Sequence, residues 1–225
     1  MTTHNFSAES PENYEQKCCC ALVLDVSKSM EGIPIKELNE GLEAFYKDIQ
    51  TDSTTANRLE IAIVVFNNEV RTLVEPDLAA NITIPKLTAS GGTKLVDGVK
   101  EGISIVKARK SWYKETGQPY YRPWVILMTD GDPDDMQDIT SLSADIRKGM
   151  ADKEFYFYAI GVQDADMKKL HQISDPTMPA AKLSGLKFSE FFRWLSASMT
   201  AITKSSEGNK INLPKPSDWM AGFTI

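Results

Sequence analysis

Three segments of the sequence carry oxygen side chains that could do chemistry together. The first is Asp25-x-Ser27-x-Ser29, which follows directly on an apolar run, and the second contains Thr93. The third is Asp130, at the end of another apolar run. Carboxylate and hydroxyl oxygens, with no nitrogen or sulfur, suit a hard cation, Mg²⁺ before Mn²⁺ or Ca²⁺. These residue types therefore predict a metal site.

Each segment alone is a weak signal. Asp-x-Ser-x-Ser arises by chance, and a serine or threonine near a helix start is usually a helix cap. Without a metal, Asp25 and Asp130 could interact with helix dipoles or cap helices at the strand ends. Carboxylates are seldom buried without a partner, however, and three segments converging on one place favour the metal.

The elements that must position these residues follow from the apolar pattern. Short, mostly apolar runs rich in β-formers predict strands that are buried on both faces. They cover residues 18–26, 59–66, 123–129 and 155–162, with a short strand at 181–183. Residues 69–74 follow Asn67-Asn68 and predict a hairpin return, hence an antiparallel edge strand. Apolar residues at helical spacing predict helices over 35–49, 95–106, 136–150, 166–173 and 188–202.

Strands that alternate with helices predict βαβ units. The expected fold is α/β: a doubly wound, Rossmann-like, mostly parallel central sheet with one antiparallel edge strand and helices on both faces. In such sheets, ligands bind outside the carboxyl ends of the strands. Asp25 and Asp130 both lie at such ends, so we expect them to meet at one edge.

Composition limits the classes of function. The chain has 225 residues, a formal net charge of −6 and a pI near 5.1, which argues against nucleic acid or an anionic membrane as partner. No apolar run is long enough to span a bilayer, and no secretory signal precedes the first strand. The three cysteines are contiguous, at positions 18–20, and fit buried thiols in a reducing compartment. We therefore expect a cytoplasmic protein without membrane insertion.

Three regions follow from these patterns. Residues 1–17 are polar and predict a disordered or loosely docked N-terminal arm. Residues 18–204 form the expected domain. Residues 205–225 are a tail rich in Lys, Gly, Asn and Pro, in which Trp219 and Phe223 are large apolar side chains. Such residues seldom stay exposed without a use, so we expect the tail to pack on the domain or serve as a handle for a partner.

The residues resemble the von Willebrand factor type A (vWA) family and its metal-ion-dependent adhesion site. Asp25, Ser27 and Ser29 match its DxSxS element, Thr93 in GGTKLVDGV its threonine loop, and Asp130 in VILMTDGDP its fourth-strand aspartate. The resemblance continues through AIGVQDADMKKLHQIS. It implies that the three hydroxyls contact Mg²⁺ directly and that the two aspartates act largely through bridging waters. It also implies a position open to a Glu or Asp of a partner protein.

Among stand-alone vWA proteins, the chain is most similar to small bacterial ones of tellurite-resistance clusters. That narrower resemblance implies a stress-response or phosphorylation-linked signalling role, with a kinase- or phosphatase-like protein as possible partner. It implies binding and not turnover, and we expect no catalytic residues and no organic cofactor.

Two alternatives remain. Haloacid-dehalogenase-type phosphatases also carry an aspartate after the first strand, and Val125–Asp135 imitates their later acidic segment. Those enzymes use DxDx[TV], however, and Ser27 stands where their general acid should be. Neither His4 nor His171 lies near a strand end, so a serine hydrolase would lack its base.

The other alternative is a vWA scaffold that binds partners through its helices or tail, with the metal incidental.

Overall fold

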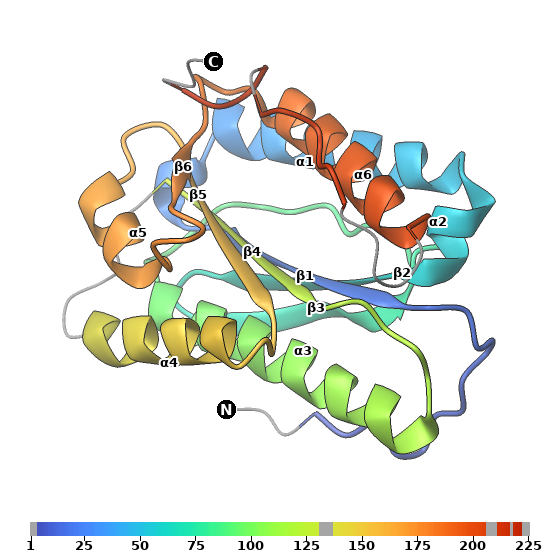
Figure 1. Cartoon of the computed structure of the whole chain (residues 1–225). Helices are drawn as coiled ribbons and strands as arrows, with labels where there is room; N and C mark the ends of the chain where they lie inside the picture. Colours follow the sequence, from blue (N-terminus) through green and yellow to red (C-terminus); the bar gives the residue numbers. More distant parts are fainter. Residues whose placement is uncertain (1–3, 131–136, 206–210, 217, 222–225) are drawn as a thin grey trace.

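The computed structural model describes residues 4–130, 137–205, 211–216 and 218–221, which form one six-stranded sheet covered by helices on both faces (Figure 1). The strand order is β3-β2-β1-β4-β5-β6, and every neighbouring pair is parallel except β2 with β3. The strands are β1 (Cys18–Asp25), β2 (Leu59–Phe66), β3 (Val70–Leu78), β4 (Trp124–Thr129), β5 (Tyr156–Gly161) and β6 (Ala181–Lys182).

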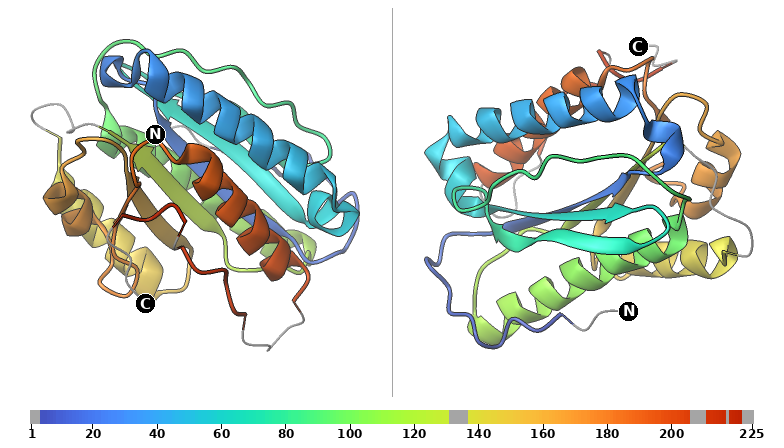
Figure 2. Two further views of the ribbon diagram at one scale, coloured as in Figure 1. Left: turned by 90° about the horizontal axis from the view of Figure 1, so that it is seen from above. Right: turned by 180° about the vertical axis from the view of Figure 1, so that it is seen from behind.

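Helices cover the sheet in two layers. Along one face lie α1 (Ile33–Gln50), α2 (Ser53–Arg58) and α6 (Phe188–Thr203). The opposite face carries α3 (Leu95–Thr116), α4 (Ile139–Ala151) and α5 (Met167–Ile173). A short 3₁₀ helix, η1 (Lys28–Met30), follows β1. Figure 2 shows α1 and α6 side by side across the sheet. The predicted α/β doubly wound sheet with one antiparallel edge strand is confirmed.

β1 is the centre of this arrangement because all eight of its residues are buried. Successive strand side chains point to opposite faces, so β1 contributes to both cores. Leu22 and Leu24 pack with α1 and α6, whereas Ala21 and Val23 pack with α3. A Cβ at Gly102 of α3 would lie 2.4 Å from Cγ2 of Val23. Glycine at this position therefore lets α3 approach β1 closely.

The boundaries follow the sequence prediction with a few differences. The antiparallel strand continues to Leu78, beyond the predicted residue 74. The predicted helix over 136–150 begins at Ile139, where Asp138 caps it by accepting a hydrogen bond from the Ser141 amide. Helix α2 was missed, because six residues are too few to show a helical period. Its signal is Asp52, which accepts from the Thr55 amide at 2.9 Å.

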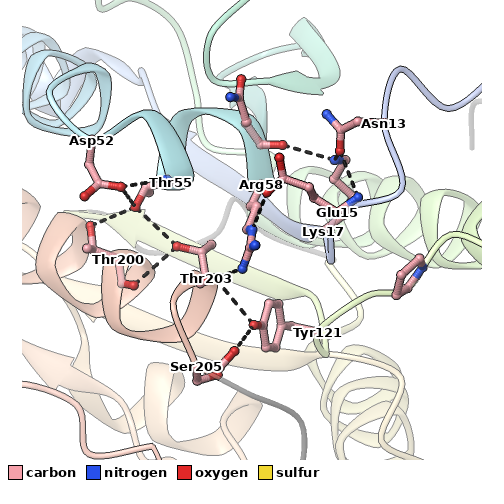
Figure 3. Close-up of polar contacts among 12 residues, drawn as sticks. Asn13, Glu15, Lys17, Asp52, Thr55, Arg58, Tyr121, Thr200, Thr203 and Ser205 are labelled. Atoms are coloured by element: carbon pink, nitrogen blue, oxygen red, sulfur yellow. Dashed lines mark hydrogen bonds and ion pairs between the residues drawn. The ribbon is translucent and has the colours of Figure 1, made fainter.

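The N-terminal arm is held more firmly than its polar sequence predicted. Glu15 and Lys17 join the cluster around Arg58 of α2 that Figure 3 shows. Arg58 donates to Glu15 Oε2 at 2.6 Å and to the carbonyl of Thr203, at the end of α6, at 2.8 Å. Further back, Phe6 is buried against α3, and the arm runs along that helix (Figure 2). These partners are distant in sequence, so local composition could not reveal them.

The C-terminal tail packs on the domain, as the sequence predicted. Trp219 is fully buried in an aromatic cluster with Tyr158, Phe191 and Trp194. The indole nitrogen of Trp194 donates to the carbonyl of Pro214 at 2.8 Å, which fixes the preceding stretch of tail. The other predicted anchor, Phe223, lies outside the described residues.

We expect Trp219→Ala to lower the free energy of unfolding by about 3–5 kcal/mol, because it removes a large side chain from a packed cluster. Urea denaturation with matched m-values measures the loss. Leu213→Ala is the control in the same tail, since Leu213 is 37% exposed and its truncation should cost far less. Equal small losses in both variants would show that the tail contributes no packing energy.

The cysteines should be inert in the folded protein. Burial raises the pKa of the Cys18 thiol to about 12, and it raises the pKa values of Cys19 and Cys20 well above their usual range. Because only the thiolate is nucleophilic, native protein at pH 8 should not react with a disulfide reagent such as DTNB. Unfolding in guanidinium should expose all three thiols, which should then react with three equivalents of the reagent per chain. Rapid reaction of the native protein would contradict this burial.

Candidate metal centre

The carboxyl ends of β1 and β4 lie side by side. The two strands are parallel, and their register pairs Leu24 with Met128. Asp25, the last residue of β1, therefore lies beside Thr129, the last residue of β4. Asp130 follows directly. The topology brings together two aspartates that are 105 positions apart in the sequence.

Four of the five predicted site residues form one chain of hydrogen bonds. The Ser27 amide donates to Asp25 Oδ1 at 2.8 Å, which turns the chain immediately after β1. The hydroxyls of Ser27 and Ser29 lie 2.9 Å apart, and Ser29 Oγ donates to Asp130 Oδ1 at 2.8 Å. The structure thus brings the DxSxS loop and Asp130 into one polar cluster.

Thr93, the fifth residue, belongs to the loop beside this cluster. The loop is held by backbone hydrogen bonds from the Ser90 amide to the Val26 carbonyl at 2.8 Å and from the Lys28 amide to the Gly91 carbonyl at 3.0 Å. Gly91 has a φ of +78°, a conformation that favours glycine. Thr93 itself is buried, with 7% of its surface exposed.

Three further residues position the site, and their roles were not predicted from the sequence. Thr129 Oγ1 donates to Asp25 Oδ2 at 2.5 Å. Asn68 Oδ1 accepts from the Gly92 amide at 2.6 Å. The Gln137 side chain donates to the Thr93 carbonyl and accepts from the Val96 amide, both at 2.7 Å, and so connects the threonine loop to α3. Of the three, only Thr129 carried a signal in the sequence, as the hydroxyl that ends a buried strand beside Asp130.

The two carboxyl groups lie in an environment that disfavours their negative charge. Asp25 is fully buried, and this burial raises its pKa to about 6; hydrogen bonds from Ser27 and Thr129 oppose the rise, and Asp130 adds to it. Burial also raises the pKa of Asp130. Among the described residues, no Lys, Arg or His nitrogen lies within 4.0 Å of either carboxylate. Such a pair of acids is suited to a bound cation.

The donor set determines which cation could fit. In the described part of the chain, no three His, Cys, Asp or Glu side chains gather in a metal-binding cluster. A metal at this edge would therefore depend on the hydroxyls of Ser27, Ser29 and Thr93 in addition to the aspartates. Oxygen donors of this kind suit Mg²⁺, Mn²⁺ or Ca²⁺ and disfavour soft metals.

A family model described as "von Willebrand factor type A domain" matches residues 21–189. Among curated proteins, mouse inter-alpha-trypsin inhibitor heavy chain H2 is 30% identical over 119 residues, and the Mesocricetus auratus protein of the same name is 29% identical. The matched segment is 49% of this chain but 12% of either relative. About half of this chain thus corresponds to one small part of those proteins.

Solved structures share the fold at low sequence identity. The pilus adhesin SpaC of Lactobacillus rhamnosus GG aligns over 86% of this chain and 31% of its own, with a TM-score of 0.67 and 15% identity. The vWF domain of the Porphyromonas gingivalis pili tip protein Mfa5 aligns over 87% of this chain and 99% of its own, with a TM-score of 0.56 and 12% identity. Proximal thread matrix protein 1 from the mussel byssus also has a TM-score of 0.56, at 18% identity, over 82% of this chain and 46% of its own.

These similarities give the phosphatase alternative no support.

None of the helices in the described residues has the length and apolar character needed to cross a membrane.

We expect Thr129→Val to lower the free energy of unfolding by about 1–3 kcal/mol, because it leaves a buried Asp25 oxygen without its donor while keeping the side-chain shape. Chemical denaturation in EDTA at pH 7.5 measures this loss without any metal contribution. Thr88→Val, at an exposed position, is the control and should change stability little. A neutral Thr129→Val would show that Asp25 does not need this hydroxyl.

Proposed function

Because the chain belongs to the von Willebrand factor type A domain family, we propose that it is a protein-interaction module whose site holds a divalent cation, Mg²⁺ before Mn²⁺ or Ca²⁺. One observation carries the proposal. Asp25 and Asp130 share a polar cluster at a sheet edge, and no basic side chain of the described residues lies within 4.0 Å of either. A cation would offset their charge.

The five residues have different roles in this proposal. Ser27, Ser29 and Thr93 would give neutral hydroxyl oxygens to the cation, and Asp25 and Asp130 would hold its waters. A bound Mg²⁺ supplies a Lewis-acidic position that can take a carboxylate oxygen. Since neutral hydroxyls leave the cation incompletely neutralised, the partner group would be a Glu or Asp side chain of another protein.

The proposal is binding without catalysis. Ser27 stands where a phosphatase of the haloacid dehalogenase type needs its general acid, so an Asp25 nucleophile would lack a proton donor. The pilus adhesins with a similar fold are compatible with an interaction role. Purified protein with Mg²⁺ should therefore hydrolyse no phosphate ester above background.

For the cellular setting, we propose a bacterial stress response like that of tellurite-resistance clusters, with a kinase- or phosphatase-like protein as partner and a cytoplasmic location. This rests on the sequence resemblance alone. The pilus proteins among the structural neighbours point to another location, and fractionation of cells that make the protein separates the two.

The first test is metal binding. At a Mg²⁺ or Mn²⁺ concentration about 100 times the dissociation constant, the metal should stabilise the fold by about 2.7 kcal/mol and raise the melting temperature accordingly. Asp25→Ala should abolish this shift. Asp145→Ala, which removes an exposed carboxylate of α4, is the control and should keep it. An undiminished shift in Asp25→Ala would place the metal elsewhere.

The second test separates metal loading from partner capture. Thr93→Ala should weaken capture by about 1–3 kcal/mol, the range for one lost polar contact at a desolvated site, because its loop adjoins the open position. Metal loading should fall less, since Ser27 and Ser29 still hold the cation. Pull-downs in Mg²⁺ and in EDTA identify the partner, and calorimetry then gives both affinities. Equal capture in both buffers would instead favour the helices or the tail as the binding surface.

A further inference from the structure

An apolar cavity opens at the end of the sheet where β4 and β5 begin, whereas the metal centre lies where β1 and β4 finish. Its walls come from the first residues of β4 and β5, the end of α6, the loop before β4, Met178 and the tail segment 211–213. The cavity has a volume of about 330 Å³. Sites for organic ligands start at roughly 300 Å³, so this cavity suits a small group such as one or two residues of a peptide.

Most of the cavity wall is aromatic or aliphatic. The rings of Trp124 and Tyr156 lie on neighbouring strands with their centroids 5.3 Å apart. Tyr121 adds a third ring, which is held by a hydrogen bond from its hydroxyl to the Ser205 carbonyl at 2.6 Å. Four flexible apolar side chains complete the lining, namely Met178, Ile202, Ile211 and Leu213. Such a wall stabilises the apolar part of a ligand by removing it from water.

The indole of Trp124 offers this cavity an unused hydrogen-bond donor. Trp124 is 4% exposed, so the ring is almost entirely buried. Its Nε1 has no hydrogen-bond partner among the described residues, yet it is not sealed from solvent as Nε1 of Trp219 is. Because the exposed part of Trp124 lines the cavity, an acceptor there could reach this N–H. A nearly buried donor without a partner costs free energy that such an acceptor would recover.

Arg122 holds a positive charge in a fixed position at the cavity wall. Its guanidinium stacks over the Tyr156 ring, with Cζ 3.9 Å from the ring centroid. Nε donates to the Phe155 carbonyl at 2.8 Å, and Nη2 donates to the Met150 carbonyl at 2.6 Å. Nη1 has no hydrogen-bond partner among the described residues. The guanidinium is therefore oriented by its neighbours but keeps two N–H groups for a ligand.

The charge of Arg122 is not neutralised by these contacts. The acceptors are neutral carbonyls, and no carboxylate of the described residues lies within 4.0 Å of the guanidinium. Asp175 attracts Arg122 from farther away, but that carboxylate accepts hydrogen bonds from Thr177. Arg122 is also the one charged residue among the described residues that line the cavity. This arrangement favours an anionic group on the ligand.

These features together indicate the chemistry of the ligand. The two unused polar groups, on Arg122 and Trp124, are both donors, so the ligand must bring acceptors. One guanidinium balances one negative charge, and its planar donors match the two oxygens of a carboxylate. The indole N–H needs a second, neutral acceptor, which a peptide carbonyl supplies. The aromatic and aliphatic wall requires an apolar side chain beside them.

We propose that this cavity binds the C-terminus of a partner chain whose last residue is apolar. The terminal carboxylate pairs with Nη1 of Arg122, Nε1 of Trp124 donates to a backbone carbonyl, and the wall covers the terminal side chain. The site needs no metal and is independent of the proposed metal centre.

Calorimetry on the full chain in EDTA tests the proposal. The probe is an N-acetylated pentapeptide of glycine and serine that ends in phenylalanine with a free carboxylate, and its matched control is the same peptide with a C-terminal amide. EDTA removes divalent cations, so the carboxylate cannot bind at the proposed metal centre. The free-acid peptide should bind, and the amide should bind about tenfold or more weakly, because it lacks the charge-assisted hydrogen bond.

Two substitutions separate the two donors. Arg122→Gln should weaken the free-acid peptide about tenfold or more and should abolish its advantage over the amide. Trp124→Phe keeps an aromatic ring and should weaken both peptides alike, since it removes only the N–H. The control is Arg193→Gln, which removes an exposed positive charge from α6 outside the cavity and should leave both affinities unchanged. Circular dichroism verifies that each variant is folded.

Two results with the unsubstituted protein would overturn the proposal, whatever the variants do. One is no binding of the free-acid peptide at millimolar concentration, including the case in which a free acid such as 4-phenylbutyrate binds in its place. The other is equal affinity for the acid and the amide. Because the experiment contains EDTA, its failure would leave the proposed metal-dependent function untouched.

Discussion

The parallel pairing of β1 with β4 is the constraint on which the rest of the structure depends. It places Asp25 beside Thr129 and Asp130, and it orders the helices that follow each strand. Strand side chains alternate between faces, so a slip of one residue in β1 would exchange its two core faces. Burying Leu22, Val23 and Leu24 contributes about 1.5–3 kcal/mol each, which the slipped register would forfeit in part. Hydrophobic packing thus sets the position of the polar site.

That position works against the stability of the metal-free protein. A fully buried carboxylate loses its hydration, and the hydrogen bonds from Ser27 and Thr129 recover only part of it, since the pKa of Asp25 remains raised to about 6. This unfavourable free energy of burying the Asp25 carboxylate arises at the position where a bound cation could offset it. A salt bridge would have removed the cost permanently, but it would also have neutralised the charge that attracts a cation. Among the described residues, no basic nitrogen lies within 4.0 Å of either carboxylate. This is expected of a cation-binding site and unexpected for two acids with a purely structural role.

The sheet could be predicted from the sequence because buried parallel strands leave short, nearly unbroken apolar runs. The common edge of the candidate site residues could be predicted because Asp25 and Asp130 stand at the ends of such runs. Asn68 and Gln137 could not be predicted, since each acts on the threonine loop through one hydrogen bond from a distant segment. The docking of the arm was underestimated for the same reason: Glu15 is held by Arg58, 43 residues away. The local amino-acid pattern indicates which segments are buried and where the chain turns, whereas polar contacts between distant segments depend on the assembled fold. The metal itself remains a prediction.

The same strand that positions the metal centre also separates it from a polar cavity at the opposite end of the sheet, lined by the N-terminal arm, β3 and α3. β1 has eight residues, and at about 3.3 Å per residue it spans about 26 Å. Lys17, in the cavity wall, directly precedes it, and Asp25 ends it. This distance exceeds the Debye length of about 8 Å at physiological ionic strength, so charges bound at the two edges would barely affect each other through solvent. Any coupling between them would have to pass through a movement of packed elements. Since β1 is buried on both faces, such a movement would disturb both cores, so the fold keeps the two ends of the sheet independent.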